Sequence, residues 1–398
     1  MEQKLTTKNL TFLIICNTIG SGVFLFSHIA FSHVRSTTVT LICWIISGII
    51  SMGIGLCYAE LGSKYPKDGG DAVYLTESFG KYAGYIFSII SVLIILPGGS
   101  SIMCKSMGEH LKILNIEENV AIACIILIFG FINIIRIEYK TQYFLTGAKL
   151  FVIVIFVFFA GLSLFLKTTS ESTFNSPNNE FTGDDKIFRI FSVIFNTLWP
   201  YDGYNTGNFI ASKIFNPSKT LPRATIISLV FIILIYLLIN VSFMRVLPFE
   251  VMADTNSSIM IEYFNYLDFK VPLKNTLPYL IMIIPAAGTL NGSIFVSISI
   301  INSFVPPQAQ KRALKLGMII LYSFLIYIYT FINKLENILG KISFCTFLFY
   351  GLSAVSLIIL KKRERKNGYE VNRIIPYLVI IFSFSVVCFT VIKIFKGN

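Results

Sequence analysis

The chain has 398 residues, of which 55% are hydrophobic and only 14% are charged, and its net charge is +12. A soluble globular domain carries about 25% charged residues, so this composition excludes an ordinary soluble domain and indicates that much of the chain faces lipid. The positive charge does not predict nucleic-acid binding, because the basic residues lie in short connections beside apolar runs, where they set topology and meet lipid headgroups.

Eleven apolar runs each approach the roughly 20 residues that a helix needs to cross a bilayer. The runs are long and lack the alternation of barrel strands, which predicts an all-α integral membrane protein with one domain over 1–398. Lysine and arginine are more frequent in the connections on the N-terminal side, so we expect a cytoplasmic N-terminus. The predicted spans are roughly 10–33, 39–60, 84–109, 119–135, 143–166, 187–211, 224–247, 277–303, 313–332, 342–360 and 374–395.

The first span is interrupted at its centre by "NTIGSGVF" (17–24). Gly20 and Gly22 flank Ser21, and glycine costs a helix interior about 1 kcal/mol relative to alanine. We expect one half-helix to end near Thr18 with free carbonyls, and a second to begin near Val23 with free amides at its positive end. A zwitterion fits across such a break, because the amides attract a carboxylate and the carbonyls accept from an ammonium group.

The sixth span is interrupted in the same way by "WPYDGYNTG" (199–207). Pro200 removes a backbone donor, and Gly203 and Gly207 loosen the helix. Interrupted spans at corresponding positions of two halves indicate the binding site of a transporter. The alternative is that the glycines only allow close helix packing.

Other chemistry has little support in the sequence. The seven cysteines include no C-x-x-C pair and the three histidines have no ligand spacing, so we predict neither a metal site nor a cofactor. Asp202 suggests an intramembrane aspartyl protease, but that enzyme needs a second aspartate on the next helix, and 224–247 contains no acidic residue. "DGGD" (68–71) is expected in a loop. We therefore predict that the protein is not an enzyme.

Several motifs together resemble the amino acid–polyamine–organocation superfamily, and within it the L-type amino acid transporter light subunits. The resemblance implies the leucine-transporter fold, with two inverted five-helix repeats at about 10–166 and 187–360, discontinuous helices 1 and 6, and an extra helix at about 374–395. The motifs that carry it are "NTIGSGVF" (17–24), "LCYAELGSKYPKDGGDAVYLTESFG" (56–80), "GAKL" (147–150), "LWPYDGYN" (198–205) with "LPRA" (221–224), and "LNGSIF" (290–295).

The resemblance also implies roles for residues at the two breaks. The backbone around Ser21, Gly22 and Val23 would take the substrate carboxylate, with Gly20 and Gly22 allowing close approach. Trp199 would form an aromatic gate over the substrate. The backbone carbonyls that would take the substrate amine are those of Thr18, Ile19, Trp199 and Asp202. The remaining candidate site residues, which lie in the same motifs, are Tyr201, Gly203 and Asn291.

Two further expectations come from the resemblance. Lys149 matches a fifth-helix lysine that lies where sodium-coupled relatives bind an ion, which implies sodium independence; the alternative is a structural cation bonded to backbone carbonyls. L-type subunits bind a glycoprotein heavy chain through a cysteine in the loop after the third helix, and here that loop, "KILNIEEN" (112–119), has none. We therefore do not expect a disulfide-linked heavy chain.

The predicted function is secondary transport of amino acids by alternating access, in the plasma membrane. Asp202 leaves the substrate class open, because a carboxylate at this depth is a functional hypothesis by default. Three interpretations of Asp202 are open. It could form an ion pair with Lys105 or Lys149, it could be protonated, or its carboxylate could attract the cationic side chain of a substrate. A permease for polyamines or cationic amino acids is thus one alternative function, and an amino acid sensor without transport is another.

Overall fold

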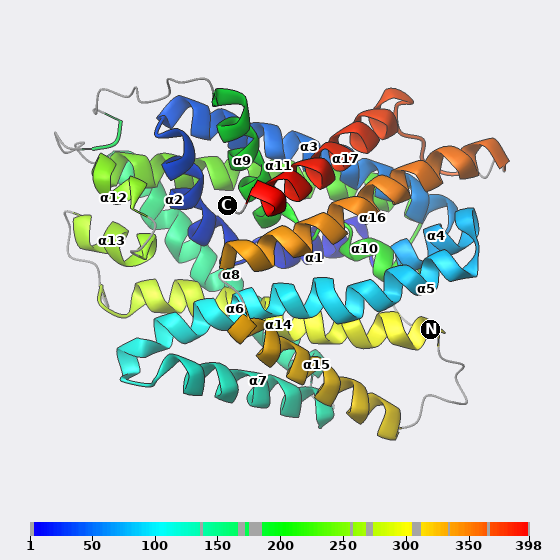
Figure 1. Cartoon of the computed structure of the whole chain (residues 1–398), viewed down its shortest axis with the longest axis horizontal. Coiled ribbons are helices and arrows are strands. Elements are labelled where there is room, and N and C mark those ends of the chain that lie inside the picture. The colour runs from blue at the N-terminus through cyan, green and yellow to red at the C-terminus, as the bar shows by residue number, and fades with distance from the viewer. Residues whose placement is uncertain are drawn as a thin grey trace.

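The computed structural model describes residues 4–135, 138–165, 172–174, 185–254, 258–267, 274–304, 312–332, 335–363 and 367–396 (Figure 1). Within these ranges the chain is helical and contains no β-strand beyond two isolated bridges, one of which joins Leu5 to Ile214. The predicted all-α class is confirmed.

Each of the eleven predicted spans lies on one or more of these helices. The helices in chain order are α1 (Thr7–Thr18), α2 (Gly22–Val34), α3 (Thr37–Lys64), α4 (Asp71–Phe79), α5 (Lys81–Ile90), α6 (Leu96–Leu111), α7 (Glu118–Ile134), α8 (Glu138–Ser163), α9 (Lys186–Leu198), α10 (Thr206–Phe209), α11 (Pro217–Val246), α12 (Phe249–Ala253), α13 (Ile259–Tyr266), α14 (Leu277–Phe304), α15 (Arg312–Ile332), α16 (Leu335–Arg363) and α17 (Ile374–Lys396). Short segments of other helix type are η1 (Ser91–Ile95, π), η2 (Lys112–Leu114), η3 (Trp199–Tyr201) and η4 (Ala211–Lys213).

The helices are long and apolar enough for a protein that crosses a membrane many times. Among the described residues, 7 helices pass that test, and the bent pair α1–α2 makes up to 8. The other predicted spans are the shorter apolar helices α7 and α15 and the interrupted sixth span. A multi-pass, all-helical membrane protein is therefore confirmed, whereas crossing by all eleven spans stays a prediction.

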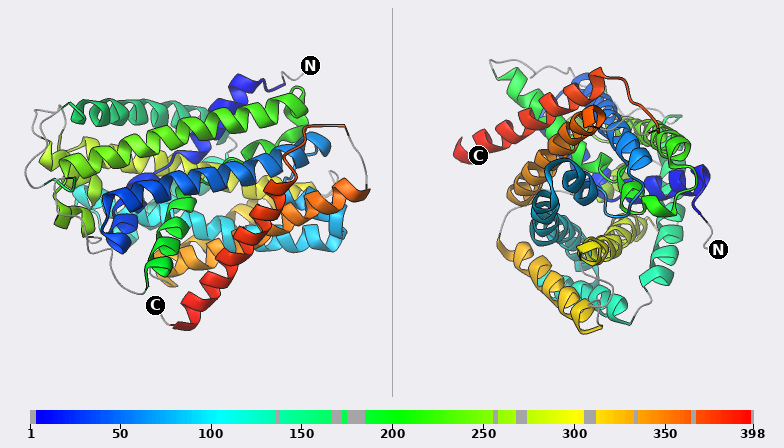
Figure 2. Two further views of the ribbon diagram at one scale, coloured as in Figure 1. Left: turned by 90° about the horizontal axis from the view of Figure 1, so that it is seen from above. Right: turned by 90° about the vertical axis from the view of Figure 1, so that its right-hand side faces the viewer.

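The long helices lie side by side in one bundle. In Figure 1, α7 and α15 run together along the lower edge, where both pack on α6. Helix α3 packs along α11, and α16 packs along α17, which crosses the bundle at a tilt in Figure 2. This arrangement leaves the outer faces of α7, α8, α11 and α17 for the lipid.

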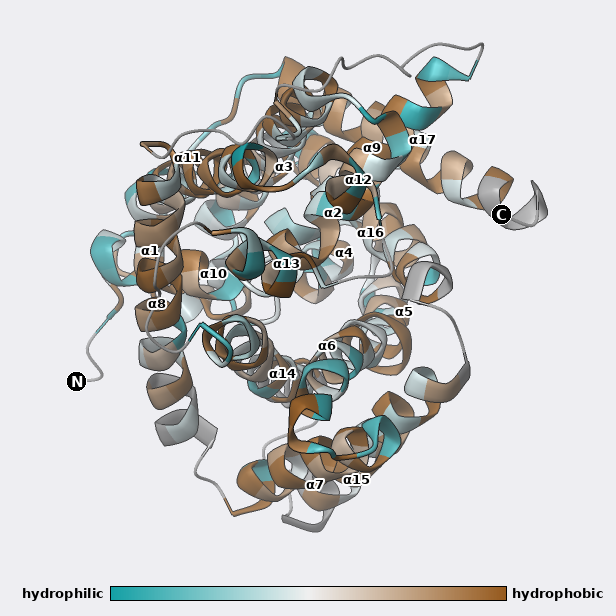
Figure 3. Cartoon of the chain, turned by 90° about the vertical axis from the view of Figure 1, so that its left-hand side faces the viewer, coloured by the Kyte–Doolittle hydropathy of each residue, from teal (hydrophilic) through white to brown (hydrophobic). Residues whose placement is uncertain are grey.

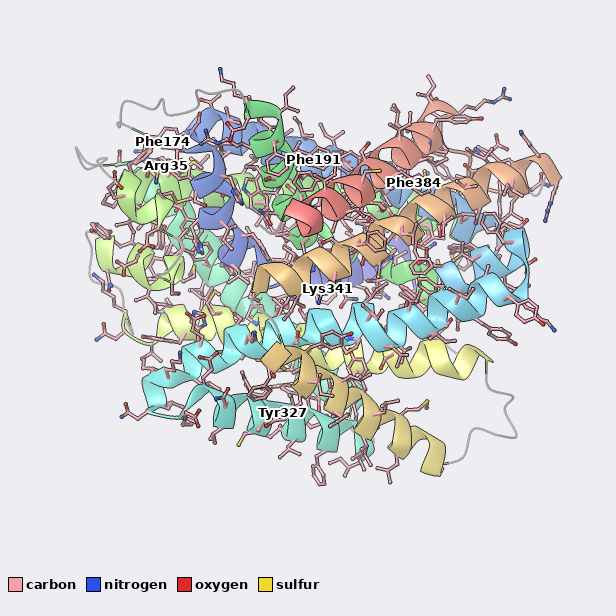
Figure 4. All side chains as sticks on the ribbon, in the orientation of Figure 1. Arg35, Phe174, Phe191, Tyr327, Lys341 and Phe384 are labelled. Atoms are coloured by element: carbon pink, nitrogen blue, oxygen red, sulfur yellow. The ribbon has the colours of Figure 1, made fainter. Side chains whose placement is uncertain are left out.

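The outer surface is apolar, as lipid contact requires. Figure 3 shows hydrophobic residues over much of α1, α7, α8 and α11. On α8, the outward side chains Phe144, Phe151 and Phe158 recur every seven residues and are 74%, 68% and 62% exposed. Tyr327, labelled on α15 in Figure 4, is exposed beside Phe331 with ring centroids 4.7 Å apart.

The first break lies where the glycines predict it. Helix α1 ends at Thr18, Ile19 has extended backbone, and α2 begins at Gly22 after a bend of 52°. Helix α2 ends before Arg35, whose backbone is left-handed (φ 47°) and which Figure 4 labels at that end. The free ends of two half-helices therefore face each other near the middle of the first span.

The second break is longer than a simple interruption. Helix α9 ends at Leu198, η3 adds one turn, and Gly203 has φ +123°, a conformation that disfavours residues with a Cβ. The chain then forms only α10, of 4 residues, and η4. The discontinuity is thus present, but short turns follow it in place of a regular half-helix.

One local expectation was wrong. "DGGD" was expected in a loop, but Asp71 is the first residue of α4. Gly69 and Gly70 have positive φ and make the turn, which lets the helix begin directly after them. Helix α4 lies in the connection between the second and third predicted spans.

Candidate functional site

A cavity of about 1070 Å³ penetrates the bundle from the side on which the N-terminus lies. Lys4, Ser212 and Lys213 line its mouth and are exposed, so the cavity reaches the protein surface there. The polar residues that line the rest of the cavity include Asn17, Asp71, Asp202, Asn205, Thr206, Thr289, Asn291, Ser293 and Tyr350. The π segment η1 also contributes to the wall, a helix type that is frequent at functional sites.

The two breaks touch each other at the inner end of this cavity. A Cβ at Gly203 would lie 2.9 Å from Thr18 Oγ1 and 3.1 Å from the α1 backbone, so only glycine lets the two segments approach this closely. Asn17 Nδ2 donates to Thr206 Oγ1 at 3.3 Å. From the sequence we expect both breaks in one site, and in the structure the two broken segments are in direct contact.

Tyr236 on α11 joins the two breaks from behind. Its buried hydroxyl is 2.7 Å from the Pro200 carbonyl oxygen and 3.3 Å from that of Thr18. The Trp199 carbonyl accepts from the Asp202 amide at 3.1 Å. Two of the four carbonyls expected to take a substrate amine therefore already have one donor each, and their second lone pair remains.

Gly22 is explained by packing. A Cβ there would lie 3.2 Å from the Trp199 ring and 3.4 Å from the Pro200 Cα. Trp199 also packs on Phe26, with ring centroids 5.3 Å apart. Gly20 differs, because the nearest atom to its Cβ position is Thr289 Oγ1 at 3.4 Å. Close helix packing therefore accounts for Gly22, whereas Gly20 adjoins Thr289, which lines the cavity.

Lys149 lies at the end of α1. Its ammonium donates to the Cys16 carbonyl and is 3.5 Å from Thr289 Oγ1, and the side chain is buried. A cation at a helix C-terminus compensates the partial negative charge of the last carbonyls. This is the structural-cation arrangement that the sequence left open, and it stands directly behind the first break.

Asp202 belongs to the cavity wall, and its carboxylate is held by hydrogen bonds. Tyr350 Oη donates to its Oδ1 at 2.5 Å, and the Gly203 amide donates to the same oxygen at 2.9 Å. In the part of the chain that the structure describes, neither Lys105 nor Lys149 pairs with it. The ion pair considered from the sequence is therefore not formed there.

The other predicted site residues are placed unequally. Asp202, Gly203 and Asn291 line the cavity, and Trp199 lines a small void of about 20 Å³ on the other side of Asp202. Tyr201 points into the core, where its hydroxyl donates to the Trp44 carbonyl at 3.0 Å. The predicted site residues that do not line the cavity are Thr18, Ile19, Gly20, Ser21, Gly22, Val23 and Lys149.

Comparison with known proteins assigns the chain to a family. The amino acid permease family matches residues 5–396. The chain belongs to this family. The relatives include human b(0,+)-type amino acid transporter 1, which is 28% identical over 403 residues, covering 96% of this chain and 81% of the relative.

Two other relatives agree with this assignment. Human large neutral amino acids transporter small subunit 2 is 24% identical over 397 residues, covering 93% of this chain and 72% of the relative. Mouse Asc-type amino acid transporter 1 is 23% identical over 397 residues, covering 93% and 73%. The resemblance to L-type amino acid transporter subunits is confirmed, and the permease aligns with them over nearly its whole length.

Sequence reasoning missed a second carboxylate in the cavity wall. Asp71, at the start of α4, accepts hydrogen bonds from the Tyr58 hydroxyl and, at 2.5 Å, from Ser353. Burial raises the pKa of the Asp71 carboxyl from 3.8 to about 6, although these two hydrogen bonds act in the opposite direction. No local motif predicts that Asp71 is buried in the cavity wall, because its hydrogen-bond partners come from α3 and α16.

Proposed function

We propose that this permease carries amino acids across a membrane by alternating access, with the substrate bound where the two breaks meet. The observation that carries the proposal is the cavity of about 1070 Å³, whose lining includes Asp202, Gly203 and Thr289. Eleven spans in the leucine-transporter fold, with two inverted repeats, form part of the proposal. The family assignment supports amino acids as the substrate class.

The chemistry of the breaks suits a zwitterion. The Leu25 amide bonds the Ser21 carbonyl at 3.0 Å, so the amides of Gly22, Val23 and Phe24 are left at the positive end of α2. A substrate carboxylate is attracted to this end, and its ammonium group to the carbonyls of Ile19 and Asp202. Because Trp199 packs on Gly22, carboxylate binding requires this ring to shift, which fits its proposed role as a gate.

The open end of the cavity indicates which state of the cycle the structure represents. The mouth lies beside the N-terminus, which we place in the cytoplasm on the basis of the lysine and arginine distribution. At the opposite end the Trp199 contacts with Gly22 and Phe26 close the path. We assign the structure to the inward-open state of a plasma-membrane transporter.

Cationic amino acids are the favoured alternative to neutral ones. Asp202 offers a carboxylate to the cavity and pairs with no lysine or arginine of the described ranges. A substrate with an ammonium or guanidinium side chain gains a charge-assisted hydrogen bond there. A polyamine has the same attraction to Asp202 but no carboxylate for the α2 end.

An uptake screen in proteoliposomes tests this function. The purified protein is reconstituted, and accumulation of radiolabelled leucine, alanine, lysine, arginine and putrescine is compared with that in protein-free liposomes. We expect saturable accumulation of at least one amino acid. Saturable binding to the purified protein without accumulation of any of these compounds would favour the sensor.

Sodium independence is tested in the same system. The Lys149 ammonium lies between the Cys16 carbonyl and Thr289, where it occupies oxygens that an ion would need. Replacing external sodium by choline should leave the initial rate of uptake unchanged. A loss of uptake in choline would show that a sodium site exists in spite of Lys149.

A disulfide-linked heavy chain is not part of the proposal. The loop from Lys112 to Glu118 contains no cysteine, and an ion pair of 2.7 Å between these two side chains closes it. The purified full-length protein should therefore migrate at the same position on gels run with and without reductant after expression beside heavy-chain partners.

A further inference from the structure

Tyr350 on α16 faces the binding cavity but has no role in the function proposed so far. Its hydroxyl donates to Asp202 Oδ1 at 2.5 Å, and the Gly203 amide donates to the same oxygen. No side chain or amide of the described ranges bonds Oδ2. The carboxylate is thus held by one oxygen, and Asp202 lines both the large cavity and the small void of about 20 Å³.

The Tyr350 hydroxyl is fixed by its surroundings. The ring packs against Tyr58, Phe347 and Tyr204, with centroid distances of 5.7, 5.7 and 5.9 Å. Aromatic rings packed on several sides have one position available, because core side chains interdigitate at crystal-like density. These ring contacts help to fix the hydroxyl beside Asp202.

Helix α16 is itself attached to parts of the bundle other than the sixth span. Ser356 bonds Ser78 at 2.7 Å and Arg363 donates to the Ser78 carbonyl at 3.0 Å, which ties α16 to the end of α4. Lys361 pairs with the buried Glu60 of α3 at 2.8 Å. Tyr350 consequently holds a side chain of the broken span against a separately anchored helix.

We propose that Tyr350 is a positioning residue that sets the preference for cationic over neutral substrates. It orients the Asp202 carboxylate so that Oδ2 meets the ammonium or guanidinium group of a substrate side chain. It also stabilises the negative charge by a hydrogen bond, which matters because an ionised carboxylate in a poorly solvated site needs donors. The inference rests on the proposed transport function and names the residue that makes Asp202 selective.

The test compares two tyrosine-to-phenylalanine variants in proteoliposomes. Y350F removes the hydroxyl and keeps the ring. Y322F is the matched control, because Tyr322 is also buried and bonds Ser100 at 2.9 Å but does not line the cavity. We expect the ratio of the lysine KM to the leucine KM to rise on the order of tenfold in Y350F and to stay within about twofold of wild type in Y322F.

Two further variants separate positioning from a structural role. In a D202N background, the added Y350F change should leave the ratio where D202N alone puts it, because there is no carboxylate left to orient. D202E keeps the charge but places the carboxylate one methylene further from the backbone, out of register with the Tyr350 hydroxyl. We expect this variant to lose the preference for lysine over leucine. It tests the inference even if Y350F does not fold.

The inference is overturned if Y350F changes both KM values by the same factor, lowers the lysine KM, or adds fully to D202N, or if D202E keeps the lysine preference. Wild-type liposomes that accumulate none of the amino acids in the screen would overturn the proposed function and the inference with it, whereas accumulation of neutral amino acids without lysine or arginine would overturn the inference alone. Uptake with unaltered selectivity in Y350F would overturn the inference alone.

Discussion

At the scale of single residues, our proposal makes the substrate class depend most on Asp202. Its carboxylate lies in the cavity wall, accepts from Tyr350 and Gly203, and pairs with no cation of the described chain. Carboxylates at this depth are costly, so we propose that the hydrogen bonds hold this charge for a ligand.

Replacing Asp202 by asparagine should weaken cationic substrates selectively. We expect the lysine KM to rise ten- to hundredfold relative to the leucine KM, which corresponds to about 1–3 kcal/mol. Competition uptake assays with lysine and leucine measure this ratio. Glu250→Gln, which removes an exposed carboxylate on α12, is the charge-matched control. A parallel loss of both substrates would contradict the selective role.

Gly203 makes the contact between the two breaks possible. Its φ of +123° strains any other residue, and a Cβ would meet Thr18 Oγ1 at 2.9 Å. Gly203→Ala should therefore destabilise the protein by about 1–3 kcal/mol. Gly161→Ala on α8 is the control, because nothing lies within 4 Å of its Cβ position. Thermal unfolding in detergent gives the comparison; equal midpoints for the two variants would show that the breaks do not need this close approach.

At the scale of helices, the sequence predicts where the breaks lie, because glycine and proline change the backbone at their own positions. Thr18 and Gly22 bound the first break as expected. The partners of the breaks cannot be predicted in this way. Tyr350 bonds Asp202 across 148 positions, and Tyr236 bonds Thr18 across 218, so these contacts depend on how the helices pack. The residues next to these two tyrosines in the sequence do not predict their contacts with the breaks; the sequence shows only that both lie in apolar spans.

Helix α4 gives the protein a pH-dependent stability. Because burial raises the Asp71 pKa from 3.8 to about 6, the native state binds more protons than the unfolded state between these values. Protonated Asp71 therefore adds to the free energy of unfolding, on the order of 2–3 kcal/mol. This stabilisation is fully present below about pH 4 and is lost as the pH rises through 6. Asp71→Asn removes this titration.

Thermal unfolding of wild type and Asp71→Asn between pH 4 and 7 checks the sign. Wild type should lose stability relative to the variant as the pH rises, with the change complete somewhat above pH 6. Parallel curves across this interval would show that Asp71 does not titrate as its burial indicates.

At the scale of the whole molecule, composition predicts a multi-pass helical membrane protein, and the structure confirms it. The side on which the cavity opens is not contained in the sequence, because one sequence serves every state of a transport cycle. Contacts such as Trp199 on Gly22 exist in the state observed, and our proposal requires them to change in another state. Apolar periodicity is the same in both states, which is why it carries no information about the state.

The central claim is that the amino acid binds in the cavity that Asn17, Asp202 and Gly203 of the two breaks help to line. Ser293 lines this cavity, and Asn119 is exposed at the start of α7. The measurement is the rate of maleimide labelling of Ser293→Cys and, as the control, Asn119→Cys, in a background without the exposed Cys124 and Cys388. Saturating transported amino acid should slow labelling at position 293 several-fold and leave position 119 unchanged. Equal labelling at position 293 with and without an amino acid that the same variant transports would contradict the claim.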